Sequence, residues 1–460
     1  MPKKAVAIFF LLAFVGAAIY IFFTFPRTKE EIPTSNNQRP FPSAPGPNGL
    51  PVPETVPHPN TPKVPPGPTL RVMAWASVAE AQALETEVDA FAAATGRHAS
   101  FTIDGDEATY RSDLQQALAS GSPPDVCLVS ARDFCGLDPA RDLADVTPGP
   151  DTAPRSVAAF TADRRIKAMP DEFSVDVLFY NLSHFDQAGI GYPDRHWNWD
   201  ILEADARAMK SLQLKDDSGQ PVYPIELPAD FDFWNILCTQ AGHPALDLDA
   251  WHLADDDTKE SQMRGLDLIH EIFQVLNITA PLPNAGVPPG RFFAKQQATL
   301  LIAPSELTAT LPKFRYAFTL LPQDLDRASL ARVNGWAVTA RSTQTDAARV
   351  LAAYLADQPV HAGWSSVKKP ADDDSSAALC YEALGRALVP RIEPKSAPMA
   401  HFLDQQINLL ARNAEESTDD LYTRIQAEFH TLISPPTLRS MEQAAEPKPK
   451  ADASSQVRRL

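Results

Sequence analysis

Apolar and polar positions divide the chain into an apolar start, a proline-rich stretch and a long region of regular patterns. The start is an almost unbroken apolar run over residues 5–25, behind Lys3 and Lys4. At about 1.5 Å per helical residue, such a run can cross a hydrocarbon core roughly 30 Å thick, which predicts a transmembrane anchor over residues 1–25. The alternative is a cleaved secretory signal, but Pro26 and Arg27 follow the run instead of small residues. We therefore expect a single-pass membrane protein whose remainder lies on the periplasmic or extracellular side.

The next stretch, residues 26–68, is rich in proline mixed with Asn, Ser, Gly and Thr. This composition buries no core and favours extended polyproline II, so it predicts a disordered linker. Residues 436–460 are mostly charged or small and predict a disordered tail. The folded domain is accordingly expected at residues 69–435.

Strand and helix patterns alternate at the start of this domain. The apolar run at residues 70–76 predicts a buried strand, and Ser77 with Glu80 has the spacing of a capping box for the helix that follows. A strand at residues 98–103, a helix at 109–120 and a strand at 125–130 come next. This β-α-β-α-β order predicts an α/β fold with a parallel sheet, which places ligands at the carboxyl ends of its strands.

Later segments continue the pattern. Asp200 and Glu203 are expected to cap a helix that runs to Leu212, and apolar steps of three and four predict a second amphipathic helix over residues 259–276. Further strands are expected at residues 174–181, 298–304, 317–322 and 334–340, and further helices at 346–356, 397–411 and 418–432.

Composition and motifs narrow the function classes. The 460-residue chain has a formal net charge of −17, which argues against nucleic acid as a partner. Its four cysteines lack metal-binding spacing, so we expect no metal site and no cofactor. Cys127 lies in an apolar run and is expected to be buried, while a disulfide with Cys135 stays open. Because the chain has no nucleophile elbow and no phosphate-binding glycine loop, we expect that the protein is not an enzyme.

Several stretches resemble the family 1 extracellular solute-binding proteins, the sugar-type receptors of ABC importers. They are LRVMAWAS, YRSDLQQALASGSPPDVCLVSARDFCGL, MPDEFSVDVLFYNLSHFDQAGIGYPDRHWNWDIL, FFAKQQATLLIAPSEL and NGWAVTARSTQTDAARVLAAYLAD. Together they span roughly residues 69–360. The resemblance implies a two-lobe periplasmic binding protein fold (type II-like), with lobe I at about 69–178 and 312–360 and lobe II at about 182–308 and 361–435. The chain departs from the family in lacking a lipobox cysteine and in having Ser305-Glu306 where relatives often have a stacking tryptophan.

A solute receptor needs apolar faces and a few fixed polar groups, and aromatic rings with carboxylates or amides suit sugars. Strand ends and the resemblance together point to ligand-binding candidates, which are Trp75, Ser77, Arg132, Asp133, Phe173, Ser174, Asp176, Asp230, Phe231, Trp234, Glu306 and Trp336. Each has a structural alternative. Trp75, Trp234 and Trp336 equally suit core packing, Arg132 and Asp133 equally suit a pair with one another, and Asp125 favours a turn cap over a ligand contact.

The resulting hypothesis is a membrane-tethered receptor that captures a small solute, a carbohydrate, between two lobes and delivers it to ABC permease subunits. Two alternatives stay open at this point. One is a sensing module that binds solute and reports to a membrane partner. The other is a glycan-processing enzyme, although no motif selects a pair of catalytic carboxylates.

Overall fold

The computed structural model describes residues 67–216, 218–247, 252–253, 258–282, 290–358, 360–373, 375–391 and 397–433. The expected anchor at residues 1–25, nearly all of the linker and the tail at 436–460 lie outside these residues. Among the helices that the structure describes, none combines the length and apolar character that a membrane span requires.

Parallel strands open the domain, as the sequence predicts. β1 (Leu70–Trp75) pairs in parallel with β2 (Ala99–Asp104) and with β3 (Val126–Ser130). The connecting helices are α2 (Val78–Thr95) and α3 (Glu107–Ala119). The capping box predicted for α2 is confirmed, and Gly96 ends this helix with a φ of 74°, a left-handed conformation that glycine adopts without strain.

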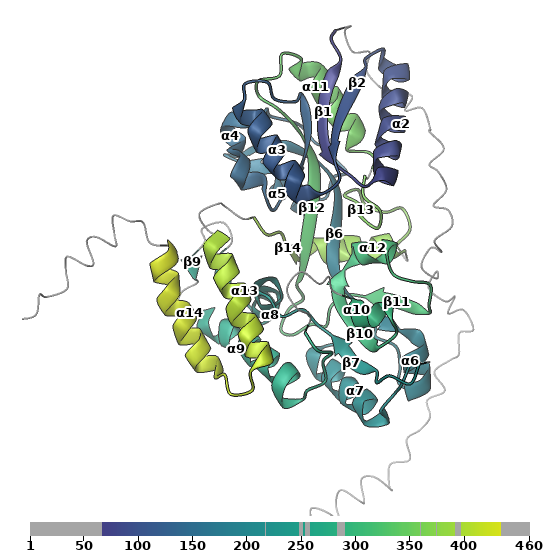
Figure 1. Cartoon of the computed structure of the whole chain (residues 1–460), viewed down its shortest axis with the longest axis vertical. Helices are drawn as coiled ribbons and strands as arrows, with labels where there is room; N and C mark the ends of the chain where they lie inside the picture. The colour runs from purple at the N-terminus through teal and green to yellow at the C-terminus, as the bar shows by residue number, and fades with distance from the viewer. Residues whose placement is uncertain are drawn as a thin grey trace, which may run out of the picture. The chain divides into compact units, whose positions relative to one another are not determined.

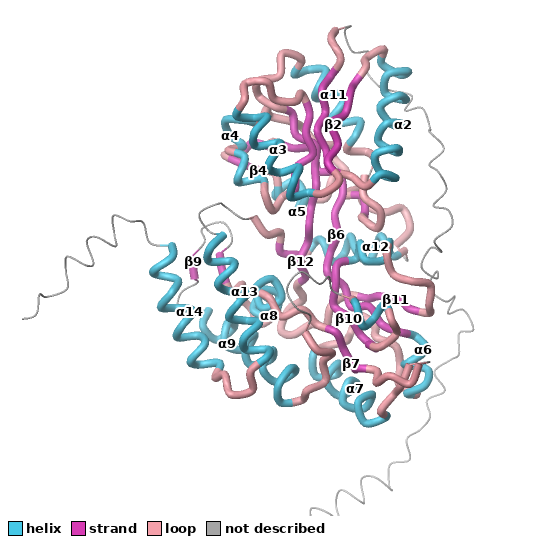
Figure 2. The backbone as a smooth tube through the Cα atoms, viewed as in Figure 1, coloured by secondary structure: helices cyan, strands magenta, loops and turns pink. Residues whose placement is uncertain are grey.

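Two long antiparallel strands carry the sheet into the rest of the domain. β6 (Ala168–Asn181) pairs with β12 (Ser329–Val338), and the strand order is β2-β1-β3-β12-β6-β10-β7. Figure 2 shows both strands running from the first part of the sheet into the second. All residues of β6 are buried, because the strand is covered on both faces along its whole length.

The remaining elements surround these strands (Figure 1). The other strands are β4 (Thr161–Ala162), β5 (Arg165–Ile166), β7 (Tyr223–Glu226), β8 (Leu246–Asp247), β9 (His252–Leu253), β10 (Ala298–Pro304), β11 (Tyr316–Thr319), β13 (Ser365–Ser366) and β14 (Ala387–Leu388). The other helices are α4 (Pro139–Asp142), α5 (Pro154–Ala159), α6 (Leu182–Ala188), α7 (Trp199–Leu212), α8 (Phe231–Gln240), α9 (Lys259–His270), α10 (Arg291–Ala294), α11 (Thr345–Leu355), α12 (Ser376–Gly385), α13 (Ala397–Arg412) and α14 (Thr418–Ile433). Short 3-10 turns cover Phe134–Leu137 and Ser305–Ala309, and a π turn covers Glu271–Val275.

The domain has two hydrophobic cores, and the first extends from β1 to β10 and β11, where it includes Leu301 and Tyr316. The first core contains Leu70, Phe91 and Leu128, and the second contains Trp199, Leu266 and Leu403. β6 and β12 contribute to both cores, since Phe173 and Val333 belong to the first core and Leu178 and Leu330 to the second. We call the part around β1, β2 and β3 the first lobe and the part around β7, β10 and β11 the second lobe (Figure 1), and together they form the expected two-lobe α/β fold.

Local details differ from the sequence prediction. α7 is capped by Asn198, whose side chain accepts from the Ile201 N–H, so the predicted cap at Asp200 is wrong. Asp200 lies inside the first turn, where its charge still favours the helix dipole. The helix expected over residues 259–276 is α-helical as far as His270 and continues as a π turn over Glu271–Val275.

α12 packs against β6 and β12, and its buried Cys380, Ala383 and Leu384 belong to the first core. Cys127 is buried as predicted, and no disulfide joins it to Cys135.

Candidate functional site

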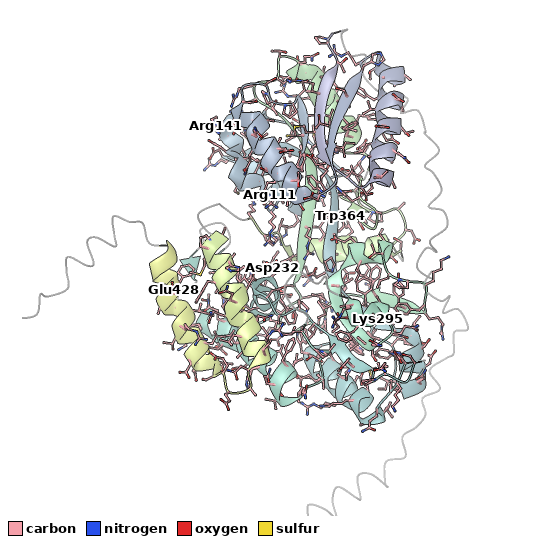
Figure 3. The ribbon with its side chains drawn as sticks, viewed as in Figure 1. Arg111, Arg141, Asp232, Lys295, Trp364 and Glu428 are labelled. Carbon is pink, nitrogen blue, oxygen red and sulfur yellow. The ribbon has the colours of Figure 1, made fainter. Side chains whose placement is uncertain are left out.

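Charged, polar and aromatic side chains from both lobes gather where β6 and β12 pass from one core to the other. We call this region the lobe junction. Its members are Trp75, Glu80, Arg132, Asp176, Asp232, Glu306, Arg332 and His361. Figure 3 shows Arg111 and Trp364 at the junction side of the first lobe and Asp232 on the second lobe.

An ion pair joins the two crossing strands at the centre of the junction. The Arg332 Nη1 of β12 lies 2.8 Å from the Asp176 Oδ1 of β6. Burial raises the pKa of Asp176, and the charge and hydrogen bond of Arg332 oppose this rise. The Arg332 guanidinium also lies within electrostatic reach of Glu306 and Asp232, so it is the central cation of an otherwise acidic group.

Glu306 begins the turn that follows β10. Its backbone N–H donates to the Ser174 Oγ at 3.3 Å, and Ser174 and Ser305 join their hydroxyls at 3.2 Å. The Glu306 Oε2 atom is buried and has no hydrogen-bond partner among the described residues. Burial raises the pKa of this carboxyl. The Glu306 carboxyl therefore keeps unused hydrogen-bonding capacity.

A short loop at residues 360–364, the His361 loop, contacts both α2 and β6. The backbone N–H groups of Val360 and His361 donate to the Glu172 Oε2 at 2.8 and 2.9 Å, and the His361 Nδ1 contacts the other carboxylate oxygen. The Ala362 N–H donates to the Glu80 Oε1 at 2.9 Å. The His361 ring stacks on Trp75 with centroids 5.4 Å apart.

A direct ion pair links the two lobes. The Arg132 Nη1 of the first lobe lies 3.3 Å from the Asp232 Oδ2 of the second. The alternative in which Arg132 and Asp133 pair with one another is wrong. Asp133 instead forms an ion pair with Arg111, whose Nη2 lies 2.7 Å from the Asp133 Oδ2. Both side chains of the Arg132–Asp232 pair are partly exposed, so water competes with this contact.

Further carboxyls stand behind this ion pair at the start of α8. Asp230 caps the helix by accepting from the Phe233 N–H at 2.9 Å, and Asp404 accepts from the Phe231 N–H at 2.9 Å. Burial, and then the nearby charge of Asp232, raise the pKa of Asp230 to about 7. These groups make the second-lobe side of the junction acidic.

Three aromatic candidates lie in the cores. Phe173, Trp234 and Trp336 have no exposed surface. The Trp234 Nε1 donates to the Gln262 carbonyl at 3.1 Å, and the Trp336 Nε1 donates to the Asp171 Oδ2 at 3.0 Å. These three rings are therefore packed in the cores, and none has a ring face available to a solute.

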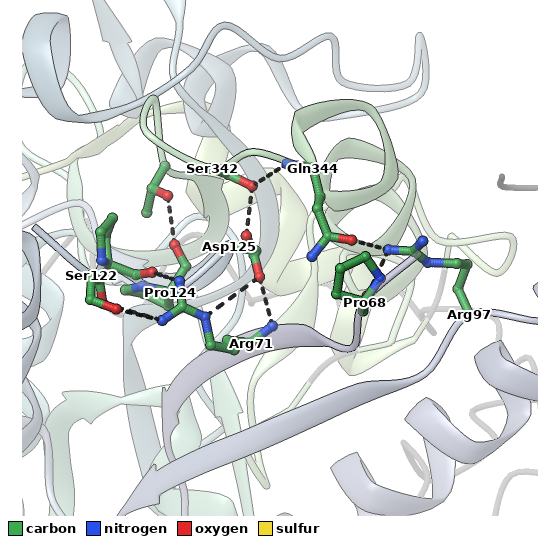
Figure 4. A network of polar contacts seen from close by, with 10 residues as sticks. Pro68, Arg71, Arg97, Ser122, Pro124, Asp125, Ser342 and Gln344 are labelled. Atoms are coloured by element: carbon green, nitrogen blue, oxygen red, sulfur yellow. Dashed lines mark hydrogen bonds and ion pairs between the residues drawn. The ribbon is translucent and has the colours of Figure 1, made fainter. Parts of the chain in front are cut away.

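The remaining candidates divide between the junction and local structure. Ser77 caps α2, where it exchanges hydrogen bonds with Glu80, and Phe231 is buried in the second core. Asp125 links the amino ends of β1 and β3: the Arg71 N–H donates to its Oδ2 at 2.9 Å, and the Ser342 hydroxyl donates to its Oδ1 at 2.6 Å (Figure 4). This carboxylate lies at the opposite end of the strands from the junction and has the structural role expected of it.

Several junction residues are not among the candidates predicted from the sequence. Arg332 left a usable signal, because a lone charge inside the apolar strand SLARVNGWAV is unusual unless it is paired. Asp232 and His361 left none, since only the fold brings them to Arg132 and Trp75. Among the described residues, no group of His, Cys, Asp and Glu side chains could hold a metal ion.

Comparison with known proteins agrees with this architecture. Residues 75–361 match the family described as bacterial extracellular solute-binding protein. No curated protein sequence is similar enough to this chain to count as a match. The match confirms the resemblance found in the sequence and agrees with the expectation of a binding protein instead of an enzyme.

Solved structures with the same fold include sugar-binding proteins. The sugar-binding protein MalE from Xanthomonas citri has a TM-score of 0.66 and 16% identity, over 82% of this chain and 100% of that chain. The cyclic alpha-maltosyl-1,6-maltose binding protein from Arthrobacter globiformis has a TM-score of 0.65 and 16% identity, over 79% and 99%. UspC from M. tuberculosis has a TM-score of 0.64 and 14% identity, over 79% and 100%. At these identities the likeness establishes the two-lobe fold.

Proposed function

The chain belongs to the bacterial extracellular solute-binding protein family, and from this premise we propose that it captures a carbohydrate and delivers it to the permease of an ABC importer. The observation that carries the proposal is the lobe junction. There the Trp75 ring, which belongs to the first core and keeps 9% of its surface exposed, and the His361 ring stacked on it adjoin charged and unpartnered polar groups contributed by both lobes. Rings that cover C–H surfaces and carboxylates that accept hydroxyl groups are the combination that carbohydrates require. The names of two similar structures, which mention sugar and a cyclic maltosyl-maltose, support the same solute class.

Solute binding at the junction would favour one arrangement of the two lobes over another. A molecule that contacts Trp75 on the first lobe and Glu306 beside the second gains most when both lobes touch it, so it favours the arrangement that permits both contacts. The Arg132–Asp232 pair can strengthen or weaken with that change, because it joins the lobes directly. The bound arrangement would present both lobes to the permease together.

The proposed location is the outer face of a membrane. The anchor at residues 1–25 would hold the chain there, and the linker at residues 26–68 would let the two-lobe domain reach a neighbouring permease. Intact-mass measurement of the protein from isolated membranes tests this part, since a cleaved signal would shorten the chain by the mass of the apolar segment.

Calorimetric titration of the full chain in detergent tests the function itself. The ligands are glucose, galactose, maltose, trehalose and raffinose, and Trp75→Ala should weaken any binding that is found. Tyr192→Ala serves as an aromatic comparison, because this exposed ring packs on Tyr180 and Phe185 instead of on the junction residues. Absence of binding throughout a broad carbohydrate panel would contradict the proposed solute class.

A further inference from the structure

A carboxylate of the second lobe holds an arginine of the first lobe at the lobe junction. The Arg132 Nη1 lies 3.3 Å from the Asp232 Oδ2, and the two side chains are 48% and 25% exposed. Arg132 follows β3, whereas Asp232 lies in the first turn of α8. The chain itself passes between the lobes in β6 and β12, so this ion pair adds a noncovalent link that can break and re-form while both cores stay folded.

The first lobe leaves the charge of Arg132 for this contact. The neighbouring Asp133 is engaged inside the first lobe, because the Arg111 Nη2 lies 2.7 Å from the Asp133 Oδ2 and the Ser130 hydroxyl donates to the same oxygen at 3.1 Å. Among the ion pairs of the described residues, Arg132 has Asp232 as its carboxylate partner. If the lobes move apart, Arg132 therefore exchanges this partner for water.

The second lobe gathers further carboxyls around Asp232. Asp230 caps α8 by accepting from the Phe233 N–H, and Asp404 of α13 reaches the start of the same helix. Asp232 and Asp404 lie within electrostatic reach of Asp230, and Arg132 lies within electrostatic reach of Asp404. Carboxylates that are crowded in this way repel one another, so a cation that approaches all of them is attracted by more than its nearest partner.

The other charges near this group do not replace Arg132. Arg332 lies within reach of Asp232, but its own ion pair is with Asp176 at 2.8 Å, so these two charges largely compensate each other. His401 acts on Asp404 from the exposed face of α13. The start of α8 therefore remains acidic, and Arg132 is the cation that the first lobe supplies to it.

We propose that Arg132 and the carboxyls at the start of α8 form an electrostatic latch that favours the joined arrangement of the two lobes before a solute binds. Attraction between one arginine and several carboxyls draws the lobes together, while exposure to water keeps the contact reversible. The inference goes beyond the proposed function, because it concerns the solute-free protein and holds for any class of solute. A solute that requires joined lobes binds more tightly when that arrangement is already populated.

Distances between spin labels on the two lobes measure the latch in the full-length, solute-free protein. Gln115→Cys on α3 and Leu409→Cys on α13 place the labels at exposed positions of the first and second lobes. Cys135→Ser accompanies them, since Cys135 is half-buried and the other three cysteines are buried. Double electron–electron resonance in detergent then reports the proportions of joined and separated arrangements.

Substitutions of Arg132 separate its charge from its size. Arg132→Met removes the cation, Arg132→Lys retains it, and Arg132→Glu replaces attraction by repulsion. The matched control is Arg264→Met, because Arg264 of α9 pairs with Asp324 inside the second lobe and its side chain is 52% exposed, close to the 48% of Arg132. Thermal melting checks that each variant folds.

At low salt, Arg132→Met should reduce the ratio of joined to separated arrangements about two- to fivefold, the range expected for a partly exposed ion pair. Arg132→Glu should reduce this ratio further, Arg132→Lys should retain most of it, and Arg264→Met should leave it unchanged. Raising the salt concentration from about 0.1 M to about 1 M shortens the Debye length from about 10 Å to about 3 Å. This change should lower the ratio for the unmodified protein and have little effect on Arg132→Met.

The outcomes are distinct. Equal ratios for Arg132→Met, Arg264→Met and the unmodified protein at low salt would overturn the inference, and so would one distance distribution shared by all variants at both salt concentrations. If Arg132→Glu does not fold, Arg132→Met and the salt series decide the question. Because no solute enters the experiment, a failure of the proposed function leaves this result unchanged, and the two can fail separately.

Discussion

Removal of the Arg332 charge should destabilise the protein in a pH-dependent way. Loss of one partner from a buried ion pair costs roughly 3–5 kcal/mol, whereas an exposed pair contributes about 0–1 kcal/mol. The side chains of Arg332 and Asp176 are 36% and 10% exposed, which places this pair between those limits. For Arg332→Met we therefore expect a loss of about 2 kcal/mol in the free energy of unfolding at pH 8.

The pH dependence of this loss follows from the Asp176 carboxyl, which keeps no cationic partner in Arg332→Met. Burial already raises the pKa of Asp176, and removal of Arg332 raises it further. A carboxyl with a raised pKa in the folded state stabilises the fold at low pH and loses that contribution as pH rises through the folded pKa. The cost of Arg332→Met should consequently be smaller at pH 5 than at pH 8.

Chemical denaturation of four proteins measures this effect: the unmodified chain, Arg332→Met, Asp176→Asn and the double variant. If the pair interacts as the structure indicates, the double variant is more stable at pH 8 than the sum of the single losses predicts. Additive losses, or a cost of Arg332→Met that is the same at pH 5 and pH 8, would refute the reasoning.

The remaining predictions concern the loop, the cap and the contact between lobes. Gly363→Ala should lower the free energy of unfolding by about 1–3 kcal/mol, because the φ of Gly363 is 82° and an added Cβ would meet the Glu306 carbonyl. Gly105→Ala should cost far less, since a Cβ built on Gly105 has no atom within 4 Å. Thermal melting of the two variants compares these costs. Between pH 6 and pH 8 the free energy of unfolding of the unmodified protein should fall by on the order of 1 kcal/mol, because Asp230 ionises through its pKa of about 7. Asp230→Asn should remove this fall, since Asn caps a helix equally well and does not ionise. Unfolding titrations at several pH values measure both. Arg132→Ala should change stability by less than about 1 kcal/mol, since its ion pair is partly exposed, and raising the salt concentration should shrink even that difference.

The sequence predicts the framework well where local chemistry decides the structure. Ser77 and Glu80 mark the start of α2, and the apolar runs around Cys127 and Leu300 mark buried strands. Trp234 and Trp336 could not be assigned, because an aromatic residue beside a strand end has the same pattern whether it packs inward or faces a solute.

The candidate site was predicted less completely for a related reason. Glu306 was identified from its place after a strand and Asp176 from the family resemblance, but their partners depend on contacts between distant segments. Arg332 meets Asp176 only through the register of β12 on β6, and His361 reaches Trp75 only because its loop folds back over α2 and β6. Periodicity reports the faces of single elements, so it does not contain such pairings.

A crystal structure of the protein with the sugar that it binds most tightly is the most direct test of a receptor site at the lobe junction. The account predicts that the sugar lies between the lobes, against the Trp75 and His361 rings and within hydrogen-bond distance of Glu306. A sugar bound to one lobe away from these residues, or a junction left without sugar at saturating concentration, would contradict it.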